Sequence, residues 1–497
     1  MKRNLAALAS QQFDIAIIGG GIVGAGIARD AAMRGASVAL VERADFAGGT
    51  SSRSTKLIHG GLRYLEQFAV GLVAEACRER SILLDMAPHL VKPLSILLPV
   101  YEGDPRSLGK IRLGTTVYDW LTPMRHRLTP RHRLLTADEA VAEEPHLPRN
   151  LLRGAVLFYD CQMDDARLCL ETILAAARHG AVCANYCAVM GFRRERDRLA
   201  AAQVKDHFSG QTFDLRAKLF INAAGPWAQR LAEMSDLGEP TIKLGPTKGV
   251  HLILPRLLRR HGIYFQSRRD GRMVFLLPWD DLTLLGTTDT EYPSDPSLAR
   301  VEAADIRYLL GQLDDLMPAA GLHESDLVTS FAGVRPLLRS DRRQPSSRSR
   351  EERIVRQGEN LLNVVGGKYT TFRAIADKAV RKSLRTLNLP VPRCLTATTP
   401  LADRRPPHEG AQISAAPIVF ESDVIHACRA ELAVTLSDVM RRRTRLALSA
   451  NGGPKIATRV SRIMAAELGW DETTRERNVQ QYQAEWSRSL PWEDHCD

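Results

Sequence analysis

The first fifty residues alternate between apolar and small side chains in an ordered way. An apolar run at residues 15–18 leads into three glycines, a longer stretch follows at 22–34, and a second short apolar run occupies 37–41. Short apolar runs bounded by turn signals predict strands, whereas the longer stretch has the length and composition of a helix. Residues 13–42 therefore predict a strand, a glycine turn, a helix and a second strand.

Apolar periodicity predicts further elements along the chain. Helical spacing marks residues 72–86 and 165–179. Short apolar runs alternate with turn signals between residues 199 and 288, which predicts an antiparallel sheet inserted beside the first unit. Residues 339–353 are rich in arginine, serine and acidic side chains and predict an exposed loop. The pattern is that of an α/β protein.

The last hundred residues have a different character. Residues 400–417 predict a linker, and residues 423–482 predict a largely helical region. A chain of 497 residues also exceeds the size at which one hydrophobic core usually stops growing. We therefore expect more than one domain.

Composition narrows the class of protein without naming a ligand. The formal net charge of +11 favours anionic partners, and the eight cysteines form no C-x-x-C pair, so neither a metal site nor a disulfide framework is predicted. No apolar run reaches the roughly 18 residues that span a bilayer, and the short apolar start is too small for a secretory signal. We expect a cytoplasmic protein that can lie on a membrane face.

The glycine turn carries the first chemical signal. Residues 19–24 read GGGIVG, directly after a predicted strand and at the start of a predicted helix, and Glu42 ends the next strand. Gly19 permits the tight turn, Gly21 lets a pyrophosphate approach the backbone, Gly24 allows close helix packing, and Glu42 suits a ribose hydroxyl pair. This context predicts a dinucleotide site, and taken alone it leaves both NAD and FAD open.

Two later strand ends favour FAD. Residues 219–225 form an apolar strand that ends in small residues, including Ala224 and Gly225. Residues 361–368 form a second such strand, ending at Gly367 and Lys368, and a helix begins beyond Thr370. Small residues allow a cofactor to approach the backbone closely, and amides at a helix start favour the negative charge of a reduced flavin.

Beyond the glycine turn the chain resembles a known family. Residues 48–65 read GGTSSRSTKLIHGGLRYL, and further matching blocks follow in the same order as in that family: YDC at 159–161, NAAGPW at 222–227, KGVH at 248–251, LGTTD at 285–289, GVRPL at 333–337 and GGK at 366–368. These motifs resemble those of the FAD-dependent sn-glycerol-3-phosphate dehydrogenases, in their aerobic, quinone-linked bacterial form. The resemblance covers residues 13 to about 375.

The resemblance implies a fold and a division of the chain. It implies a glutathione-reductase-like FAD-binding Rossmann domain over residues 1–400, interleaved with an antiparallel-sheet substrate domain that comes mainly from residues 85–155 and 240–340. A helical C-terminal domain would follow over residues 401–497. The stretch before its helices, residues 404–426, is short for the family, so the dimer or membrane contacts of that domain are in doubt.

The resemblance also implies a site. Arg63, Tyr64, Arg335 and Lys368 match positions that hold the substrate's phosphate and hydroxyl oxygens, and Arg350 matches another more weakly. Arginine suits this task because its planar donors pair bidentately with phosphate oxygens. Cofactor contacts are expected from Gly19, Gly21, Gly24, Glu42, Thr50, Ser51, Ser52, Lys56, Leu57, His59, Gly60, Gly61, Ala224, Gly225, Gly367, Lys368 and Thr370.

The implied reaction oxidises sn-glycerol 3-phosphate to dihydroxyacetone phosphate, with hydride passing to flavin. A base is needed for the hydroxyl proton, and histidine has a suitable pKa. His59 and His251 are equal candidates, and Arg335 could instead stabilise the developing alkoxide. The acceptor would be a membrane quinone, which places the enzyme on the inner face of the cell membrane, as a monomer or homodimer.

Residues 106–133 fit that location. Seven lysines and arginines alternate there with apolar side chains, a composition suited to an anionic lipid surface, although a solvated basic helix explains it equally well. Three alternatives stay open: an oxygen-reducing glycerol-3-phosphate oxidase or related FAD-dependent 2-hydroxy acid oxidase, a basic nucleic-acid-binding flavoprotein, and a flavin-stabilised scaffold. The chain has no recognised RNA-binding motif, so we expect no nucleic acid partner.

Overall fold

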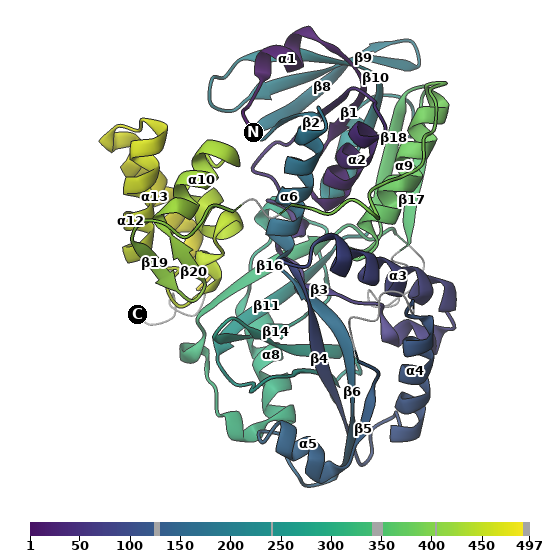
Figure 1. Ribbon diagram of the computed structural model, residues 1–497, viewed down its shortest axis with the longest axis vertical. Coiled ribbons are helices and arrows are strands. Elements are labelled where there is room, and N and C mark those ends of the chain that lie inside the picture. Colours follow the sequence, from purple (N-terminus) through teal and green to yellow (C-terminus); the bar gives the residue numbers. More distant parts are fainter. Residues whose placement is uncertain (124–129, 240–241, 340–350, 403–404, 491–497) are drawn as a thin grey trace.

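The computed structural model describes residues 1–123, 130–239, 242–339, 351–402 and 405–490. Two large β-sheets lie one above the other in Figure 1, and a mostly helical unit from the end of the chain lies beside them. Arg350 lies outside the described residues. So does the predicted exposed loop at 339–353, except for residues 339 and 351–353 at its ends.

The first sheet contains the two strands predicted within residues 13–42, which are joined by the predicted glycine turn and helix. Its strands run in the order β17-β18-β10-β1-β2-β7, with β8 and β9 attached beyond β10. β1, β2, β7, β10 and β18 are mutually parallel, whereas β17 is antiparallel to β18. The strand bounds are Gln12–Ile18 (β1), Val38–Val41 (β2), Val182–Ala184 (β7), Cys187–Glu195 (β8), Arg198–Asp206 (β9), Thr212–Asn222 (β10), Glu352–Gln357 (β17) and Leu361–Gly366 (β18).

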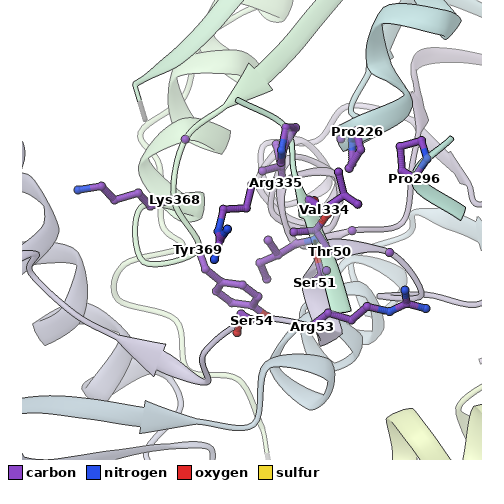
Figure 2. A pocket seen from close by; sticks show the side chains of 18 of the residues that line it. Thr50, Ser51, Arg53, Ser54, Pro226, Pro296, Val334, Arg335, Lys368 and Tyr369 are labelled. Carbon is purple, nitrogen blue, oxygen red and sulfur yellow. Dashed lines mark hydrogen bonds between the residues drawn. The ribbon is translucent and has the colours of Figure 1, made fainter. Parts of the chain in front are cut away.

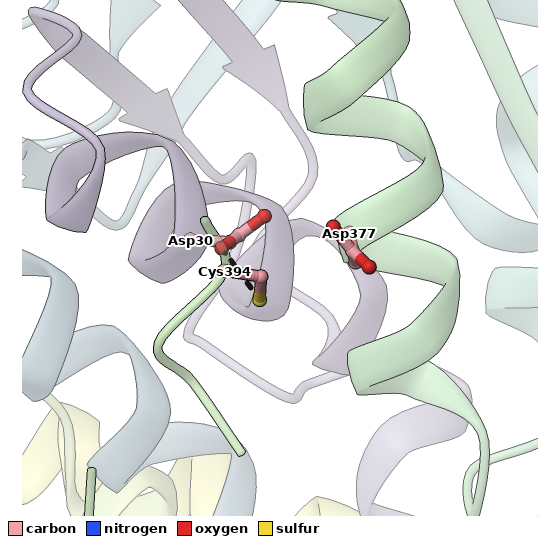
Figure 3. Close-up of side chains that lie close together, drawn as sticks. All are labelled: Asp30, Asp377 and Cys394. Atoms are coloured by element: carbon pink, nitrogen blue, oxygen red, sulfur yellow. Dashed lines mark hydrogen bonds between the residues drawn. The ribbon is translucent and has the colours of Figure 1, made fainter. Parts of the chain in front are cut away.

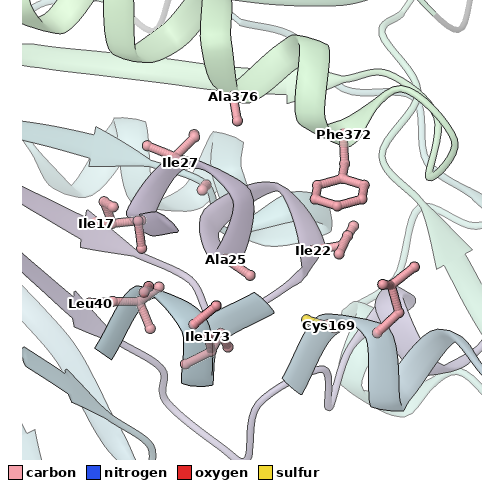
Figure 4. Packing of buried hydrophobic residues seen from close by; sticks show 14 of the residues in the cluster. Ile17, Ile22, Ala25, Ile27, Leu40, Cys169, Ile173, Phe372 and Ala376 are labelled. Atoms are coloured by element: carbon pink, nitrogen blue, oxygen red, sulfur yellow. The ribbon is translucent and has the colours of Figure 1, made fainter. Parts of the chain in front are cut away.

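Helices cover this sheet because its central strands are apolar on both faces. α2 (Ile22–Met33) packs between α6 (Asp165–Arg178) and α9 (Phe372–Thr386) (Figure 4). Gly26 permits the close approach of α9, since an added Cβ there would lie 2.8 Å from the Phe372 ring. The remaining helices of this half are α1 (Leu5–Ser10), α7 (Ala228–Met234) and the 3-10 turns η1 (Thr50–Ser52) and η4 (Gly225–Trp227).

The second sheet is almost entirely antiparallel. Its order is β15-β11-β14-β13-β12-β4-β6-β3, with β16 on β11 and β5 on β6, and only the β12–β4 pair is parallel within the described residues. The strands are β3 (Leu57–Ile58), β4 (Val91–Tyr101), β5 (Arg133–Leu135), β6 (Leu152–Met163), β11 (Thr247–Pro255), β12 (Gly262–Gln266), β13 (Met273–Trp279), β14 (Leu282–Gly286), β15 (Thr290–Glu291) and β16 (Thr329–Arg335).

Helices from several parts of the chain flank the second sheet (Figure 1). They are η2 (Leu62–Gln67), α3 (Val70–Met86), α4 (Leu108–Leu121), α5 (Ala137–Glu143), η5 (Pro296–Leu298), α8 (Ala303–Leu316), η6 (Pro318–Ala320) and η7 (Glu324–Asp326). In the described part of the chain, none of the helices is long and apolar enough to cross a membrane.

The C-terminal unit is helical, with one small hairpin. Its elements are β19 (Gln412–Ala415), β20 (Ile418–Phe420), α10 (Glu421–Ala430), α11 (Leu436–Asp438), the π-turn η9 (Val439–Arg443), η10 (Leu446–Leu448), α12 (Pro454–Leu468) and α13 (Glu472–Ser487). The prediction of a linker at residues 400–417 was wrong near its end, because residues 412–415 form β19, which pairs with β20. Ile413 and Val419 of this hairpin pack into the apolar core of the C-terminal unit, but these two residues are too few for the pattern to indicate strands.

Candidate functional site

A cavity of about 740 Å³ lies between the two sheets. One side is formed by the carboxyl ends of β1, β2, β10 and β18, where open parallel sheets commonly bind ligands. The other side comes from β11, β16 and neighbouring strands of the second sheet. Figure 2 shows part of the lining, with Thr50 next to Val334 and Arg335.

The glycine turn forms one end of this cavity. Gly19 has φ +119°, and an added Cβ would lie 2.5 Å from the Ala223 carbonyl oxygen. Gly21 lines the cavity close to Ser51, whose Oγ accepts a hydrogen bond from the Ile22 N–H at 2.9 Å. Gly24 does not line it: a Cβ there would lie 2.0 Å from the Gly19 carbonyl oxygen, so its role is to let α2 pack against the turn.

Glu42 faces the cavity from the end of β2. Its two carboxylate oxygens accept hydrogen bonds from the Gly20 N–H at 2.7 Å and the Ala44 N–H at 3.0 Å. Burial raises the pKa of Glu42, and these two backbone hydrogen bonds oppose the rise. The backbone thus orients this carboxylate toward the cavity, as the recognition of a ribose requires.

The segment after the glycine turn divides into lining and supporting residues. Thr50, Ser51 and Leu57 line the cavity, whereas Ser52 and Lys56 do not. The Lys56 ammonium is buried and donates to Asp165 Oδ1 at 2.5 Å and to the Ser52 carbonyl at 2.7 Å. Sequence reasoning placed Lys56 against the cofactor, but its position makes it an anchor of this segment.

The next residues surround the far part of the cavity. His59 and Gly61 line it, and Thr370 lines it too while its Oγ1 bonds the backbone N–H and carbonyl of His59, both at 3.2 Å. Gly60 lies behind this surface; its N–H donates to Tyr118 Oη at 2.6 Å. Gly60 therefore supports the cavity wall without lining it.

Ala224, Gly225, Gly367 and Lys368 also line the cavity. Gly367 has φ +82°, and an added Cβ would lie 2.4 Å from Ile375 Cδ1. The strand ends that carry these residues are adjacent, because β18 pairs with β10 next to β1. The described residues fit FAD: the cavity runs from a glycine turn and an acidic residue to strand ends with small residues, and an added Cβ at Gly19 would collide with the Ala223 backbone at one of these ends.

Cationic side chains gather around Tyr64 in another part of the cavity. Lys368 Nζ lies 3.9 Å from the ring centre of Tyr64, and the Arg63 guanidinium carbon lies 5.1 Å from the same ring. Tyr64 is buried and all three residues line the cavity. Three of the predicted substrate residues are therefore neighbours, although Lys368 lies far along the chain from Arg63 and Tyr64.

Arg335 enters from β16 and is held firmly. Its guanidinium donates to Asp289 Oδ1 at 3.0 Å, to Thr287 Oγ1 at 3.0 Å and to the Thr288 carbonyl at 3.2 Å. It lies over Gly249 on the neighbouring strand β11, where an added Cβ would be 2.2 Å from Nη2. Glycine at this position leaves room for the guanidinium.

His251 lies two residues after Gly249, on the same face of β11. Its ring is buried, stacks on Phe331 with ring centres 4.9 Å apart, and places Nε2 2.9 Å from Thr55 Oγ1. Nδ1 has no hydrogen-bond partner among the described residues. Burial, reinforced by the positive charges of Arg335 and Lys56, lowers the pKa of His251 well below its usual value, so the ring is neutral near pH 7.

Some lining residues escaped sequence reasoning. Tyr264 and Phe275 come from β12 and β13 and stack with ring centres 4.3 Å apart. Arg43 lies 4.0 Å from the ring centre of Trp227, and both line the cavity. Nothing local distinguishes these aromatic residues from ordinary core positions, although Trp227 belongs to the NAAGPW block.

One cluster outside the cavity contains groups of metal-ligand type. Potential ligand atoms of Asp30, Asp377 and Cys394 lie within 4.8 Å of one another (Figure 3). However, Arg34 pairs with both carboxylates, and burial raises the pKa of the Cys394 thiol. We assign this group as an ion-pair cluster that joins α2 to α9 and the following segment.

Comparisons with known proteins identify the family of this chain. Residues 14–377 match the family described as FAD dependent oxidoreductase, and residues 395–475 match the C-terminal domain of alpha-glycerophosphate oxidase. A glycerol-3-phosphate dehydrogenase of Synechocystis sp. is 34% identical over 97% of this chain and 97% of its own length. An aerobic glycerol-3-phosphate dehydrogenase of Staphylococcus saprophyticus is 39% identical over 74% of this chain and 66% of its own.

A solved structure with a similar fold supports the same family. The crystal structure of the glycerol-3-phosphate dehydrogenase from Bacillus halodurans complexed with FAD has a TM-score of 0.78 and 28% identity, covering 98% of this chain and 97% of that one. The fold class and the FAD cofactor predicted from the sequence are confirmed. The chain belongs to the FAD-dependent glycerol-3-phosphate dehydrogenase family.

Proposed function

We propose that this protein oxidises sn-glycerol 3-phosphate to dihydroxyacetone phosphate. The observation that carries the proposal is the convergence of Arg63, Lys368, Arg335 and His251 on one cavity that fits FAD. Bound FAD supplies the acceptor for the two electrons and the hydrogen removed from the C2 carbon. The protein's own residues bind the substrate, orient it and take the hydroxyl proton.

We assign the phosphate and the C2 oxygen of the substrate to different cationic residues. A phosphomonoester carries nearly two negative charges, and Arg63 and Lys368 offer two cationic groups, each in contact with the Tyr64 ring. Arg335 lies near His251, close enough for its charge to lower the pKa of that histidine. Arg63 and Lys368 therefore hold the phosphate, and Arg335 stabilises the negative charge that develops on the C2 oxygen.

His251 is our choice for the base. Its ring is neutral, lines the cavity and keeps Nδ1 unpartnered among the described residues, so it can accept a proton. His59 lines the same cavity and is the alternative. The two assignments predict that different variants lose turnover: His251→Asn in the first case and His59→Asn in the second.

The test is anaerobic mixing of the yellow holoenzyme with glycerol 3-phosphate. We expect the flavin absorbance to bleach with glycerol 3-phosphate and far less with glycerol, because glycerol lacks the phosphate. Arg335→Ala should lose this bleaching by roughly 100-fold or more while retaining flavin. Arg307→Ala, which removes an exposed arginine of α8, serves as the control and should bleach normally. Equal bleaching by glycerol, or by a 2-hydroxy acid without phosphate, would contradict the proposal.

The electron acceptor separates dehydrogenase from oxidase. We propose a membrane quinone, and the match of residues 395–475 to an oxidase domain keeps oxygen as the second candidate. Reoxidation of the bleached enzyme should be much faster with a short-chain quinone than with dissolved oxygen. Faster reoxidation by oxygen, with peroxide formed, would make the protein an oxidase.

Exposed apolar residues support a place on a lipid surface. Phe68, Leu113 and Trp120 are 90%, 66% and 80% exposed, on η2 and the contacting helix α4, with the exposed Arg112 beside Leu113. Large apolar side chains next to cations suit an anionic bilayer. The other cations of the predicted basic segment fit less well, since Arg106 and Lys110 pair with Glu66 and residues 124–129 lie outside the described residues.

Vesicle binding tests this surface. Trp120→Ser should weaken binding to phosphatidylglycerol vesicles by roughly tenfold, since one buried indole contributes more than 1.4 kcal/mol. Phe208→Ser removes an exposed aromatic residue from the other sheet and should change nothing. Equal loss in both variants, or none in Trp120→Ser, would remove the lipid assignment. The homodimer stays a prediction that sedimentation can test.

A further inference from the structure

One loop of the FAD cavity is held from behind by the C-terminal unit. The loop of residues 43–49 follows Glu42, and Arg43, Ala44, Gly48 and Gly49 line the cavity. Between them Asp45 turns away from the cavity, and its carboxylate is 1% exposed. The cavity face and the buried carboxylate are thus opposite sides of the same short loop.

The groups that meet this carboxylate come mainly from η9. Arg443 pairs with both oxygens of Asp45, and Arg442 Nε donates to Oδ2 at 2.5 Å. A further hydrogen bond, 3.0 Å long, comes from Asn185 of the first sheet. Although burial alone would raise the pKa of Asp45, the two guanidinium groups hold it well below its usual range, so the carboxylate is charged.

A second layer of contacts fixes the arginines. Arg442 also pairs with Asp438 at 2.8 Å, and Tyr186 Oη donates to the same carboxylate at 2.6 Å. Arg443 Nη2 also donates to the Glu431 carbonyl at 2.8 Å. Because each guanidinium is bound at more than one point, Asp45 meets a preformed cationic socket on the C-terminal unit.

Backbone contacts on the other side of the loop are few. The Ala47 N–H donates to the Gly20 carbonyl at 3.0 Å, and the Tyr186 N–H donates to the Ala44 carbonyl at 2.8 Å. Ala47 adopts φ +60°, a backbone conformation that residues other than glycine rarely take. A loop with a residue in this region needs outside contacts to keep its shape.

We propose that Arg443 and Arg442, through Asp45, position the loop of residues 43–49 and thereby set how tightly FAD is held. The three side chains do not line the cavity, so they act as positioning residues. The C-terminal unit would then serve cofactor retention as well as packing. This proposal needs FAD binding alone and is independent of the substrate and of the electron acceptor.

The test measures flavin release without substrate. Purified holoenzyme is diluted in steps, and the fluorescence of released FAD gives the dissociation constant. We expect Arg443→Gln and Asp45→Asn each to raise it roughly tenfold or more, because each breaks a buried ion pair and leaves the charged partner with fewer contacts beside the loop. Arg445→Gln is the matched control: Arg445 joins the same unit to Asp164 and Asp280, away from the loop, and should change release by less than about twofold.

Two further measurements exclude a merely structural effect. On heating, flavin release in Arg443→Gln should precede the loss of circular dichroism, whereas the two transitions stay together in the wild type. The double variant Asp45→Asn with Arg443→Gln should release FAD no more readily than Asp45→Asn alone, because Arg443 acts through Asp45. If Arg443→Gln fails to fold, Arg442→Gln takes its place. Wild-type dissociation constants in folded variants, or release that only follows unfolding, would overturn the proposal.

Discussion

The two sides of the cavity are built in different ways. The side formed by the first sheet presents glycines and backbone groups, such as Gly19 and Gly21, whose lack of side chains makes the space. The side formed by the second sheet presents long polar side chains, such as Arg335 and His251. The first side fits FAD closely, and under our proposal the second side selects the substrate by its charge.

This contrast has a physical origin. The backbone amides of a glycine turn form a surface that substitutions at residues other than glycine leave unchanged. Such a surface suits a pyrophosphate, which is identical in every FAD molecule. A small phosphorylated substrate needs directed cations, which only side chains supply. We therefore expect changes on the first side to act on flavin binding and changes on the second side to act on substrate turnover.

The largest effect is expected for Gly24→Val. Its Cβ would meet the Gly19 carbonyl oxygen at 2.0 Å, so α2 must move away from the glycine turn. The protein should purify without flavin, which the ratio of absorbance at the flavin band to that at 280 nm measures. The control is Gly71→Ala in α3, where an added Cβ meets nothing within 4 Å. A yellow Gly24→Val protein would break the comparison.

The next effect is expected for His251→Asn. Loss of the base should lower the turnover number by about 10² to 10⁴, with flavin retained. Because the pKa of His251 lies well below its usual value, the ring stays neutral as the pH falls, and wild-type activity should persist below pH of about 6.5. Wild-type turnover in His251→Asn, with a loss of this size in His59→Asn instead, would assign the proton to His59.

Local pattern was enough for the first side and insufficient for the second. Gly19, Gly24 and Glu42 lie within one short stretch, so their order along the chain already predicts the turn and its acid. His251 and Arg335 meet only because β11 pairs with β16, and no periodicity indicates that register. Their role was available through family resemblance, not through spacing.

The C-terminal unit marks the limit of sequence reasoning. Arg443 contacts Asp45 across 398 residues, and nothing in the run of three arginines at residues 441–443 indicates this partner. Lys56 lies within a cofactor motif and yet pairs with Asp165, because a motif records which residues occur together and not which way each side chain points. Tertiary pairing decides both cases.

A moderate effect is expected for Gly249→Val. The added side chain would occupy the position of the Arg335 guanidinium, with its Cβ 2.2 Å from Nη2. Flavin should remain bound while the kcat/KM for glycerol 3-phosphate falls by roughly 10- to 100-fold, as for loss of one charge-assisted contact. Gly109→Ala in α4, whose Cβ would meet nothing within 4 Å, should leave both quantities unchanged. Loss of flavin in Gly249→Val would show that the two sides are not separate.

The smallest effect is expected for Thr50→Val, which tests the link between the sides. Thr50 lines the cavity on the first side, and its Oγ1 donates to the Val334 carbonyl on β16 at 2.6 Å, next to Arg335. Removal of this neutral hydrogen bond should cost about 1 kcal/mol of unfolding free energy and raise the KM a few fold through a shift of Arg335. Thr50→Ser keeps the donor and should behave as the wild type. If the FAD dissociation constant changes instead of the KM, Thr50 acts on the cofactor, as the motif first indicated, and the boundary between the two sides lies beyond it.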